Sequence, residues 1–256
     1  MIAETHEEIE ILREGGKNIA RALQTLKGMV RPGATARQLE DKARELMEEV
    51  GDETILLGYK YDARKPAYHS ALCVSVNDVM VHSPAIDNRA VFKDGDIVSI
   101  DFVIKHKGYC LDSAVTAIAG KPKSKEDQKL VDLSYEALDA GIAQAKVGNT
   151  TGDIGYAVEQ IARKNGLGYP KNLSGHGIGK KIHEEPHVPN FGAPGSGTKL
   201  VEGMVLTVEP MFALGSGDLR IGEDGHGYET KDGSRTAHVE HTVLVTKDGP
   251  EILTKI

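Results

Sequence analysis

The sequence predicts an α+β fold in which two related halves place helices against a mainly antiparallel β-sheet. Three observations lead to this prediction. Residues 4–29 and 124–145 have the apolar spacing of long helices, β-rich runs follow each helical region, and one short helix pattern occurs twice. The length of 256 residues fits one large or two small domains, because a hydrophobic core stops growing at roughly 250–300 residues.

Two helices are expected before the first strands. The first covers residues 4–29, where few breakers occur apart from Gly15 and Gly16. The second follows Pro32-Gly33-Ala34-Thr35 and carries apolar residues at positions 39, 43, 46, 47 and 50. It ends at Gly51, as expected for a helix that stops at a glycine.

The second helix pattern recurs 115 positions later. Gly33 corresponds to Gly148, and Gly51 corresponds to Gly166. An alternative explanation is that any helix bounded by glycines looks alike. We interpret the recurrence as a duplicated half, which gives a single domain over 1–256 with halves at about 4–120 and 121–256 that share one sheet and one core.

The strands are expected in a small number of β-rich runs. These runs are Ala71 to Val81, Asp96 to Ile104, Tyr109 to Ile118, Met204 to Val208 and His238 to Val245. Their arrangement with the helices is typical of an antiparallel sheet covered by helices.

Composition excludes several classes of function. The chain has 38 acidic and 31 basic residues and a net charge of −7, so it lacks the basic field that nucleic acids or anionic membranes require. Its start is acidic, and no apolar run approaches the ~20 residues of a membrane span, so we expect a cytoplasmic protein. Two cysteines are too few for a disulfide framework or a thiolate zinc site. Any metal site must therefore use histidines and carboxylates.

Two aspartates interrupt a predicted hairpin over residues 96–118. A two-residue loop at His106 and Lys107 would place Asp101 directly opposite Asp112, with Cβ atoms ~5 Å apart. Opposed like charges destabilise a hairpin unless a cation lies between them. The alternative is a solvated polar face; the apolar flanks favour a metal site.

Two glutamates and three histidines extend this set. Glu209 and Glu240 interrupt strands that otherwise look buried, although each alone could be a charge on an edge strand. His176 is framed by glycines, and His183 follows it by seven residues. His82 ends an apolar run. A donor set rich in oxygen and with one imidazole suits Mn, Fe, Co or Zn in a paired-metal site, and paired metals activate water and polarise carbonyls. The residues alone thus predict a dinuclear metallohydrolase.

In this order the motifs resemble the type I methionine aminopeptidases, which are metallopeptidases with the pita-bread fold. The resemblance covers about residues 4–255. It rests on the following segments: Cys73 to His82, Ile100-Asp101 with Asp112 eleven residues later, Gly175-His176-Gly177-Ile178-Gly179, His183-Glu184-Glu185-Pro186, Val208-Glu209-Pro210 and Val239-Glu240-His241-Thr242.

The resemblance implies a set of roles. The metal ligands would be Asp101, Asp112, His176, Glu209 and Glu240, and they would hold two divalent ions of Co, Mn, Fe or Zn. Metal-bound hydroxide would attack the first peptide carbonyl with Glu209 as general base. His183 would stabilise the tetrahedral intermediate, and His82 would orient the amide and protonate the leaving amine. The implied reaction is removal of the initiator methionine before a small second residue.

The resemblance also implies a methionine pocket and a set of partners. Tyr68 and Cys73 occupy pocket positions, while Leu173, Ile182 and His226 stand where aromatic residues are common. Methionine packs adaptably, so such a pocket can still hold it. The implied partners are the N-termini of nascent polypeptides and, transiently, the ribosome. The chain is expected to act as a monomer and to bind neither nucleic acid nor a membrane.

Two alternatives remain. A proline-specific peptidase such as a prolidase or aminopeptidase P shares the fold and metals, but such proteins carry an additional histidine before the metal-binding one. Here Asn172 and Ser174 precede His176 instead. A non-catalytic binding homologue would have lost metal ligands, whereas all five are present.

Overall fold

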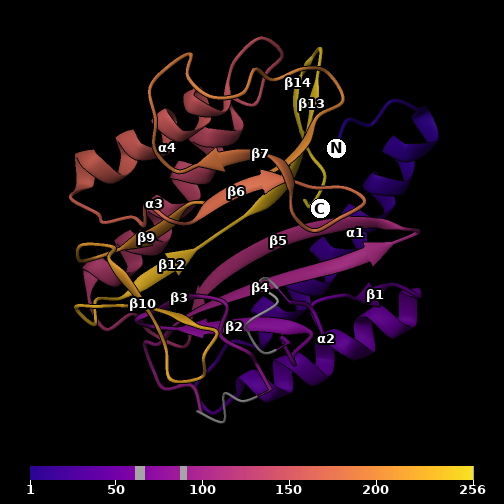
Figure 1. The fold of residues 1–256 in the computed structure, drawn as a ribbon. Coiled ribbons are helices and arrows are strands. Elements are labelled where there is room, and N and C mark those ends of the chain that lie inside the picture. Colours follow the sequence, from indigo (N-terminus) through magenta and orange to yellow (C-terminus); the bar gives the residue numbers. More distant parts are fainter. Residues whose placement is uncertain (61–66, 87–90, 256) are drawn as a thin grey trace.

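This computed structural model describes residues 1–60, 67–86 and 91–255 of the chain. The described part contains four helices and fourteen strands. The helices are α1 (His6–Met29), α2 (Ala36–Val50), α3 (Lys125–Ile142) and α4 (Thr151–Asn165). The strands of the first half are β1 (Glu53–Thr54), β2 (Leu72–Val76), β3 (Val79–Val81), β4 (Ile97–His106) and β5 (Tyr109–Ile118). Those of the second half are β6 (Ser174–Gly177), β7 (Glu184–Pro189), β8 (Val205–Val208), β9 (Met211–Ala213), β10 (Leu219–Ile221), β11 (Tyr228–Thr230), β12 (Thr236–His238), β13 (His241–Thr246) and β14 (Gly249–Ile252). Figure 1 shows the two halves side by side.

The repeated helix pattern produces two helices with the same caps. Thr35 is the N-cap of α2, and Thr150 is the N-cap of α4. Each threonine forms a capping box, in which its side chain accepts a hydrogen bond from the backbone N–H three residues later. Gly51 and Gly166 end these helices in the left-handed region, at φ 74° and 68°. Only glycine adopts this conformation at little cost, so the two glycines mark equivalent helix ends.

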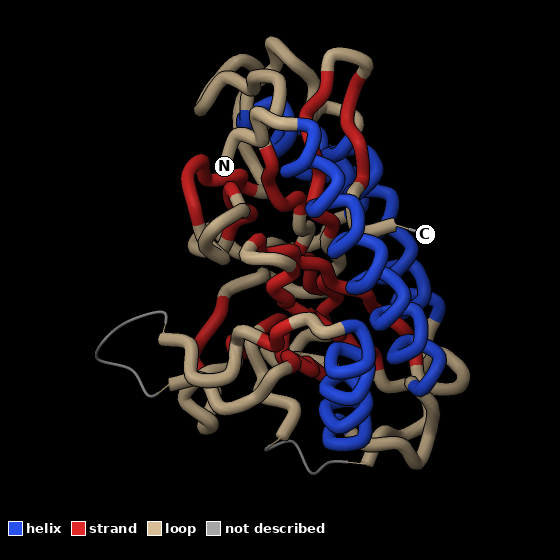
Figure 2. The backbone as a smooth tube through the Cα atoms, turned by 90° about the vertical axis from the view of Figure 1, so that its right-hand side faces the viewer, coloured by secondary structure: helices blue, strands red, loops and turns tan. Residues whose placement is uncertain are grey.

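The strands form two principal sheets rather than the single shared sheet that the sequence predicted, and all the described pairings are antiparallel. In the first sheet β4 lies between β2 and β5 and also pairs with β1. The second has the order β14-β13-β8-β6-β7. The two meet at a bridge where the Glu240 N–H donates to the Ala114 carbonyl at 3.0 Å. The helices gather on one face of the strands, and loops occupy the opposite face (Figure 2). This arrangement leaves the loop face open for a site.

The register of the β4–β5 hairpin differs from the prediction. Its loop is Lys107-Gly108, at φ 45° and 88°, and His106 pairs with Tyr109. Two central residues with positive φ suit the twist of a tight hairpin, and glycine provides one of them cheaply. Asp101 therefore faces Ala114, and Asp112 faces Val103. The predicted direct opposition of the two aspartates is wrong: they are diagonal neighbours on the same face.

Two predicted strands are also shorter than expected. The run 71–81 divides into β2 and β3 at a turn where Asn77 has φ 59°. The run 238–245 divides between β12 and β13, so that Glu240 lies at the bridge between the sheets. The first break had a local signal that the prediction did not use, because Asn77 and Asp78 are residue types that favour tight turns. The second break depends on the pairing of Glu240 with Ala114, which local alternation could not reveal.

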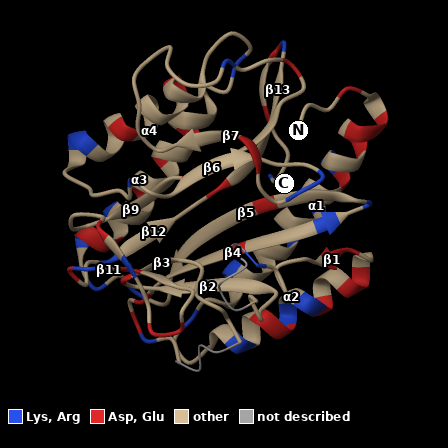
Figure 3. Cartoon of the chain, viewed as in Figure 1, with Lys and Arg blue, Asp and Glu red and all other residues tan. Residues whose placement is uncertain are grey.

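The largest hydrophobic cluster contains residues from both halves. Most come from α1, α2, β2, β4 and β5, and they pack with Ile178, Ile182, Val205, Leu244 and Leu253. In α1, Gly16 allows this packing: a Cβ at that position would lie 2.2 Å from the Leu253 carbonyl oxygen. The outer surface of α2 carries alternating acidic and basic residues (Figure 3), including the Arg37–Asp41 and Lys42–Glu45 ion pairs. No helix of the described chain is both long enough and apolar enough to cross a bilayer.

Candidate metal centre and active site

Two aspartates from the β4–β5 hairpin form one wall of the site. Asp112 is 6% exposed. Burial raises the pKa of Asp101 to about 6. Burial, followed by the charges of Asp101 and Glu209, raises the pKa of Asp112 well above its usual range. Asp101 and Asp112 lie on the same face of the hairpin, so it is costly to ionise both carboxyl groups without a cation.

His176 faces this wall from β6. Its Nδ1 lies 3.0 Å from the Gly177 carbonyl oxygen, and its Nε2 lies 3.9 Å from Asp112 Oδ2 and 3.7 Å from Glu209 Oε1. Donation from Nδ1–H to the carbonyl leaves a lone pair on Nε2, directed at the carboxylates. Burial lowers the pKa of His176 to about 3, which favours the neutral ring that a metal requires.

The glycines around His176 let neighbouring backbone approach. A Cβ on Gly175 would lie 2.6 Å from the Thr207 carbonyl oxygen, and a Cβ on Gly177 would lie 2.2 Å from that of Glu185. The glycine frame seen in the sequence therefore lets β6 fit between β7 and β8 and fixes the position of the imidazole.

Two glutamates complete the set. Glu209 follows β8 and accepts a hydrogen bond from the Thr207 hydroxyl at 2.9 Å; burial raises its pKa to about 8. Glu240 is 2% exposed, and burial together with the charges of Asp112, Glu209 and Asp101 raises its pKa well above its usual range. Both carboxyl groups are thus held in a site that favours their neutral form unless positive charge is supplied.

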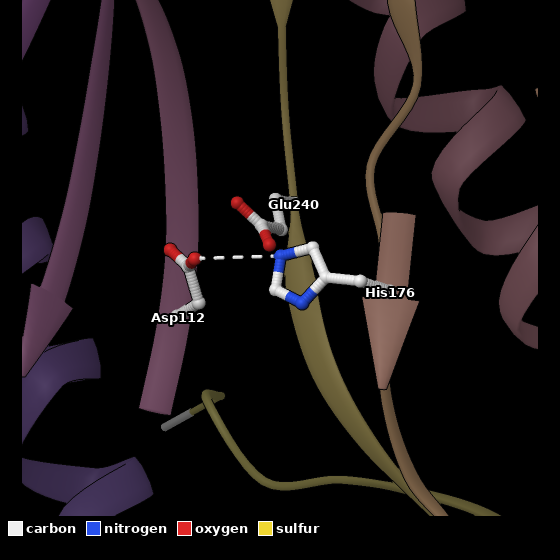
Figure 4. A group of neighbouring side chains, drawn as sticks. All are labelled: Asp112, His176 and Glu240. Carbon is white, nitrogen blue, oxygen red and sulfur yellow. Dashed lines mark ion pairs between the residues drawn. The ribbon is translucent and has the colours of Figure 1, made fainter. Parts of the chain in front are cut away.

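Three of these side chains converge closely enough to hold a metal ion. Ligand atoms of Asp112, His176 and Glu240 lie within 4.8 Å of one another (Figure 4). Asp112 Oδ1 and Glu240 Oε1 have no hydrogen-bond partner among the residues that the structure describes. Buried oxygens without donors, in a group of carboxylates with raised pKa, fit a divalent cation. Asp101 and Glu209 adjoin the three, so the residues present suit a metal centre.

The carboxylates and His176 lie in a cavity of about 250 Å³. The predicted auxiliary residues His82 and His183 line it, as do the pocket residues Tyr68, Leu173, Ile182 and His226. The Tyr68 and His226 rings meet edge to face at 5.3 Å. Cys73 lies behind this wall rather than on it: the thiol is buried, and its Sγ accepts the Tyr68 hydroxyl hydrogen at 3.0 Å.

The two auxiliary histidines occupy different settings. The His183 ring lies 4.4 Å from that of His176, and His183 Nδ1 is 3.0 Å from the Tyr59 hydroxyl. His82 has φ 64°, and its ring contacts Tyr228 at 5.6 Å. A left-handed backbone is uncommon for histidine and costs energy, which the surrounding contacts offset. His82 directly follows β3 and lines the cavity in this conformation.

Comparison with known proteins agrees with this geometry. Residues 10–247 match the model of metallopeptidase family M24. A methionine aminopeptidase of Aquifex aeolicus is 42% identical over 97% of this chain and 96% of its own length. One from Clostridium perfringens is 39% identical over 100% and 99%. The chain belongs to the methionine aminopeptidases of family M24.

Solved structures support the same assignment. The methionine aminopeptidase of Thermotoga maritima superposes with a TM-score of 0.94, at 37% identity and over 100% of both chains. The prolidase of Pyrococcus furiosus has a TM-score of 0.77 at 24% identity, and only 66% of that chain is covered. The predicted α+β pita-bread fold is confirmed. The prolidases share this fold but are more distant relatives, so the methionine aminopeptidase prediction is favoured over the proline-specific alternative.

One buried residue of the site was not predicted from the sequence. His238 lines the cavity, and its Nε2 lies 4.0 Å from Glu209 Oε2 and 3.9 Å from Glu240 Oε2. The signal was present, because His238 precedes Glu240 by two residues, the spacing of one strand face. Tyr59 was also missed, and local sequence offered no signal for its contact with His183.

Proposed function

We propose that this chain removes the N-terminal methionine from nascent polypeptides whose second residue is small. The observation that supports the proposal is the convergence of Asp112, His176 and Glu240 beside Asp101 and Glu209, at a cavity that also contains His82 and His183. The relatives, which match over nearly their whole length, are methionine aminopeptidases. We assign the whole of 1–256 to one catalytic domain.

The five predicted ligands would hold two divalent ions of Co, Mn, Fe or Zn. Eight carboxylate oxygens and one imidazole nitrogen form a hard donor set that suits these metals better than a thiolate site would. When bound, such ions lower the pKa of a water molecule and polarise a carbonyl. The carboxylates whose pKa is raised by burial would then ionise against that positive charge.

Three side chains have separate roles in the proposed reaction. Glu209 takes the proton of the attacking water; it lines the cavity, and the hydrogen bond from Thr207 orients its carboxylate. His183 donates to the oxygen that becomes negative in the tetrahedral intermediate. His82 orients the scissile amide and supplies a proton to the leaving amine. The free α-amino group of the substrate binds beside the metal centre, which restricts cleavage to the first residue.

The methionine side chain would occupy the part of the cavity near Tyr68 and His226. The two rings present polarisable faces and edges, against which a thioether packs favourably. Leu173 and Ile182 add apolar surface to the same cavity. Because its side chain is flexible, methionine can fill a pocket in which Leu173, Ile182 and His226 stand where aromatic residues are common in the family.

We place the protein in the cytoplasm, acting as a monomer on the N-termini of nascent chains during transient contact with the ribosome. Neither nucleic acid nor membrane is part of this proposal, since the net charge of −7 opposes binding to either.

Peptide turnover tests the proposed function. Met-Gly and Met-Ala peptides are compared with X-Pro peptides, after chelation and after adding back Co²⁺, Mn²⁺, Fe²⁺ or Zn²⁺ separately. We expect release of methionine only with metal, and loss of both activity and metal in His176→Ala with the fold retained. Preference for X-Pro peptides would overturn the proposal, and full activity of the chelated protein would overturn the metal assignment.

A further inference from the structure

His238 is a buried imidazole of the cavity to which the proposed reaction assigns no role. It is the last residue of β12 and is 2% exposed. Its main chain is fixed on both sides: the N–H donates to the Ser99 and Thr116 hydroxyls at 3.2 Å, and the carbonyl accepts from the Thr116 hydroxyl. The direction of the side chain is therefore set by the strands around it.

The ring is directed at two of the proposed metal ligands. Nε2 of His238 lies 4.0 Å from Glu209 Oε2 and 3.9 Å from Glu240 Oε2. The other oxygen of Glu209 lies 3.7 Å from His176 Nε2, so this carboxylate sits between two imidazoles. The gaps exceed a direct hydrogen bond, but one bridging water or a small side-chain rotation spans them.

His238 and His176 differ in whether Nδ1 of the ring has a hydrogen-bond acceptor. Nδ1 of His176 has the Gly177 carbonyl as acceptor, which frees its Nε2 to bind a metal. Neither ring nitrogen of His238 has a partner among the described residues. For a neutral ring, the proton is then best placed on Nε2, where two carboxylate oxygens face it. With its proton on Nε2, the ring of His238 can donate a hydrogen bond to the carboxylates but cannot bind a metal through that nitrogen.

We propose that His238 is a positioning residue that donates its Nε2–H toward Glu209 and Glu240 and so orients two of the carboxylates of the metal centre. The inference rests on the proposed function, which gives these glutamates their roles. A buried imidazole without a hydrogen-bond partner destabilises the native state, and this donation offsets that cost.

Substitution and metal titration test the role. In His238→Leu the ring is replaced by an apolar side chain, whereas His238→Gln keeps an N–H donor. In the leucine variant we expect Mn²⁺ affinity, measured by calorimetry with the metal alone, to fall about tenfold, with a similar loss in kcat on a Met-Gly peptide and KM within about twofold. His238→Gln should recover most of both losses. His241→Gln is the matched control, because His241 is also a strand histidine but bonds Thr254; its Mn²⁺ affinity should equal that of the unmodified protein.

Nitrogen-15 NMR of the protein, labelled at histidine and loaded with ¹¹³Cd, determines the tautomer of His238. This measurement requires neither catalytic turnover nor a substitution. We expect His176 Nε2 to couple to ¹¹³Cd, and His238 to remain uncoupled with its proton on Nε2. Coupling at His238, a proton on its Nδ1, or unchanged Mn²⁺ affinity and kcat in His238→Leu would each overturn the inference. If the unmodified protein failed to cleave Met-Gly peptides, the proposed function would fall, while the NMR experiment would still decide the tautomer of His238.

Discussion

The hydroxyl oxygen of Tyr59 lies 3.0 Å from Nδ1 of His183, at the cavity that holds the candidate metal centre. The main chain of Tyr59 is in turn fixed to the cavity wall, because its carbonyl accepts the N–H of Tyr68 at 2.7 Å. Donation from the hydroxyl to Nδ1 would place the imidazole proton on Nε2, where His183 can donate to substrate.

Tyr59→Phe should lower kcat on a Met-Gly peptide. The loss of one hydrogen bond to His183 corresponds to about 1 kcal/mol, or roughly fivefold in rate. Steady-state kinetics measures the effect. Tyr156→Phe is the control, since Tyr156 is exposed on α4 and should behave like the unmodified enzyme. An unchanged kcat in Tyr59→Phe would show that the contact does not orient His183.

Asp101→Asn should weaken metal binding and stabilise the metal-free protein. Asp101 and Asp112 are diagonal neighbours on one face of the hairpin, so their charges repel without a cation. At pH 8 Asp101 is largely ionised in the native state, because its pKa is about 6. We expect at least a tenfold loss of Mn²⁺ affinity by calorimetry, with a factor of about ten corresponding to 1.4 kcal/mol.

Thermal unfolding in the presence of a chelator at the same pH checks the second half of that prediction. The Tm of Asp101→Asn should rise, whereas Asp132→Asn on the surface of α3 should leave it unchanged. A lower Tm would mean that Asp101 stabilises the apo hairpin through contacts other than its charge.

Metal removal should make stability depend on pH. The native-state pKa of Glu209 is about 8 and that of Asp101 about 6, whereas both lie near 4 in the unfolded chain. At these two groups the native state binds more protons than the unfolded chain, so their contribution to stability is fully present below about pH 4 and is lost as the pH rises toward 8. The buried histidines, whose pKa is lowered, oppose this trend below about pH 6.5, so Tm is measured from pH 7 to 8 with chelator, where it should fall, and Mn²⁺ should raise it most at the highest pH. A Tm of the apo protein that rises over this interval would contradict the buried-carboxylate account.

Glu40→Gln should destabilise the segment next to the proposed methionine pocket. Glu40 is fully buried in α2 and accepts hydrogen bonds from the Ser70 hydroxyl at 2.7 Å and from the N–H groups of Ala71 and Leu72 at 2.8 and 2.9 Å. The amide removes acceptor capacity in a buried site, at a cost of about 2–4 kcal/mol. Denaturant unfolding measures the loss. Glu45→Gln, on the exposed side of α2, should cost little.

The same variant should raise KM for a Met-Gly peptide, because residues 70–72 connect Tyr68 of the pocket to β2. A stability loss with no change in KM would limit the role of Glu40 to folding.

Local sequence predicted the helices well because their ends carry their own signals. Thr35 and Gly51 bound α2, and Thr150 and Gly166 bound α4, in agreement with the prediction within the usual uncertainty of helix ends. The hairpin register was predicted wrongly, although the sequence carries a signal for it. Loops at His106-Lys107 and at Lys107-Gly108 are both short, but Gly108 favours the second because glycine adopts a positive φ without strain.

The sequence by itself determined which chemical groups were available: carboxylates and one glycine-framed histidine in β-rich segments, a capped helix that occurs twice, and too few cysteines for any thiolate site. Such features are local, since spacing and residue type express them within a few positions. Only the tertiary structure decided that Glu240 bridges to Ala114, that His238 faces Glu209, that Tyr59 reaches His183, and that Cys73 lies behind the pocket wall. Each of these contacts depends on the register and packing of strands or loops, and for most of them the residues are far apart in the chain. A one-residue change in register turns a side chain to the other face of the sheet, so no local pattern could establish them.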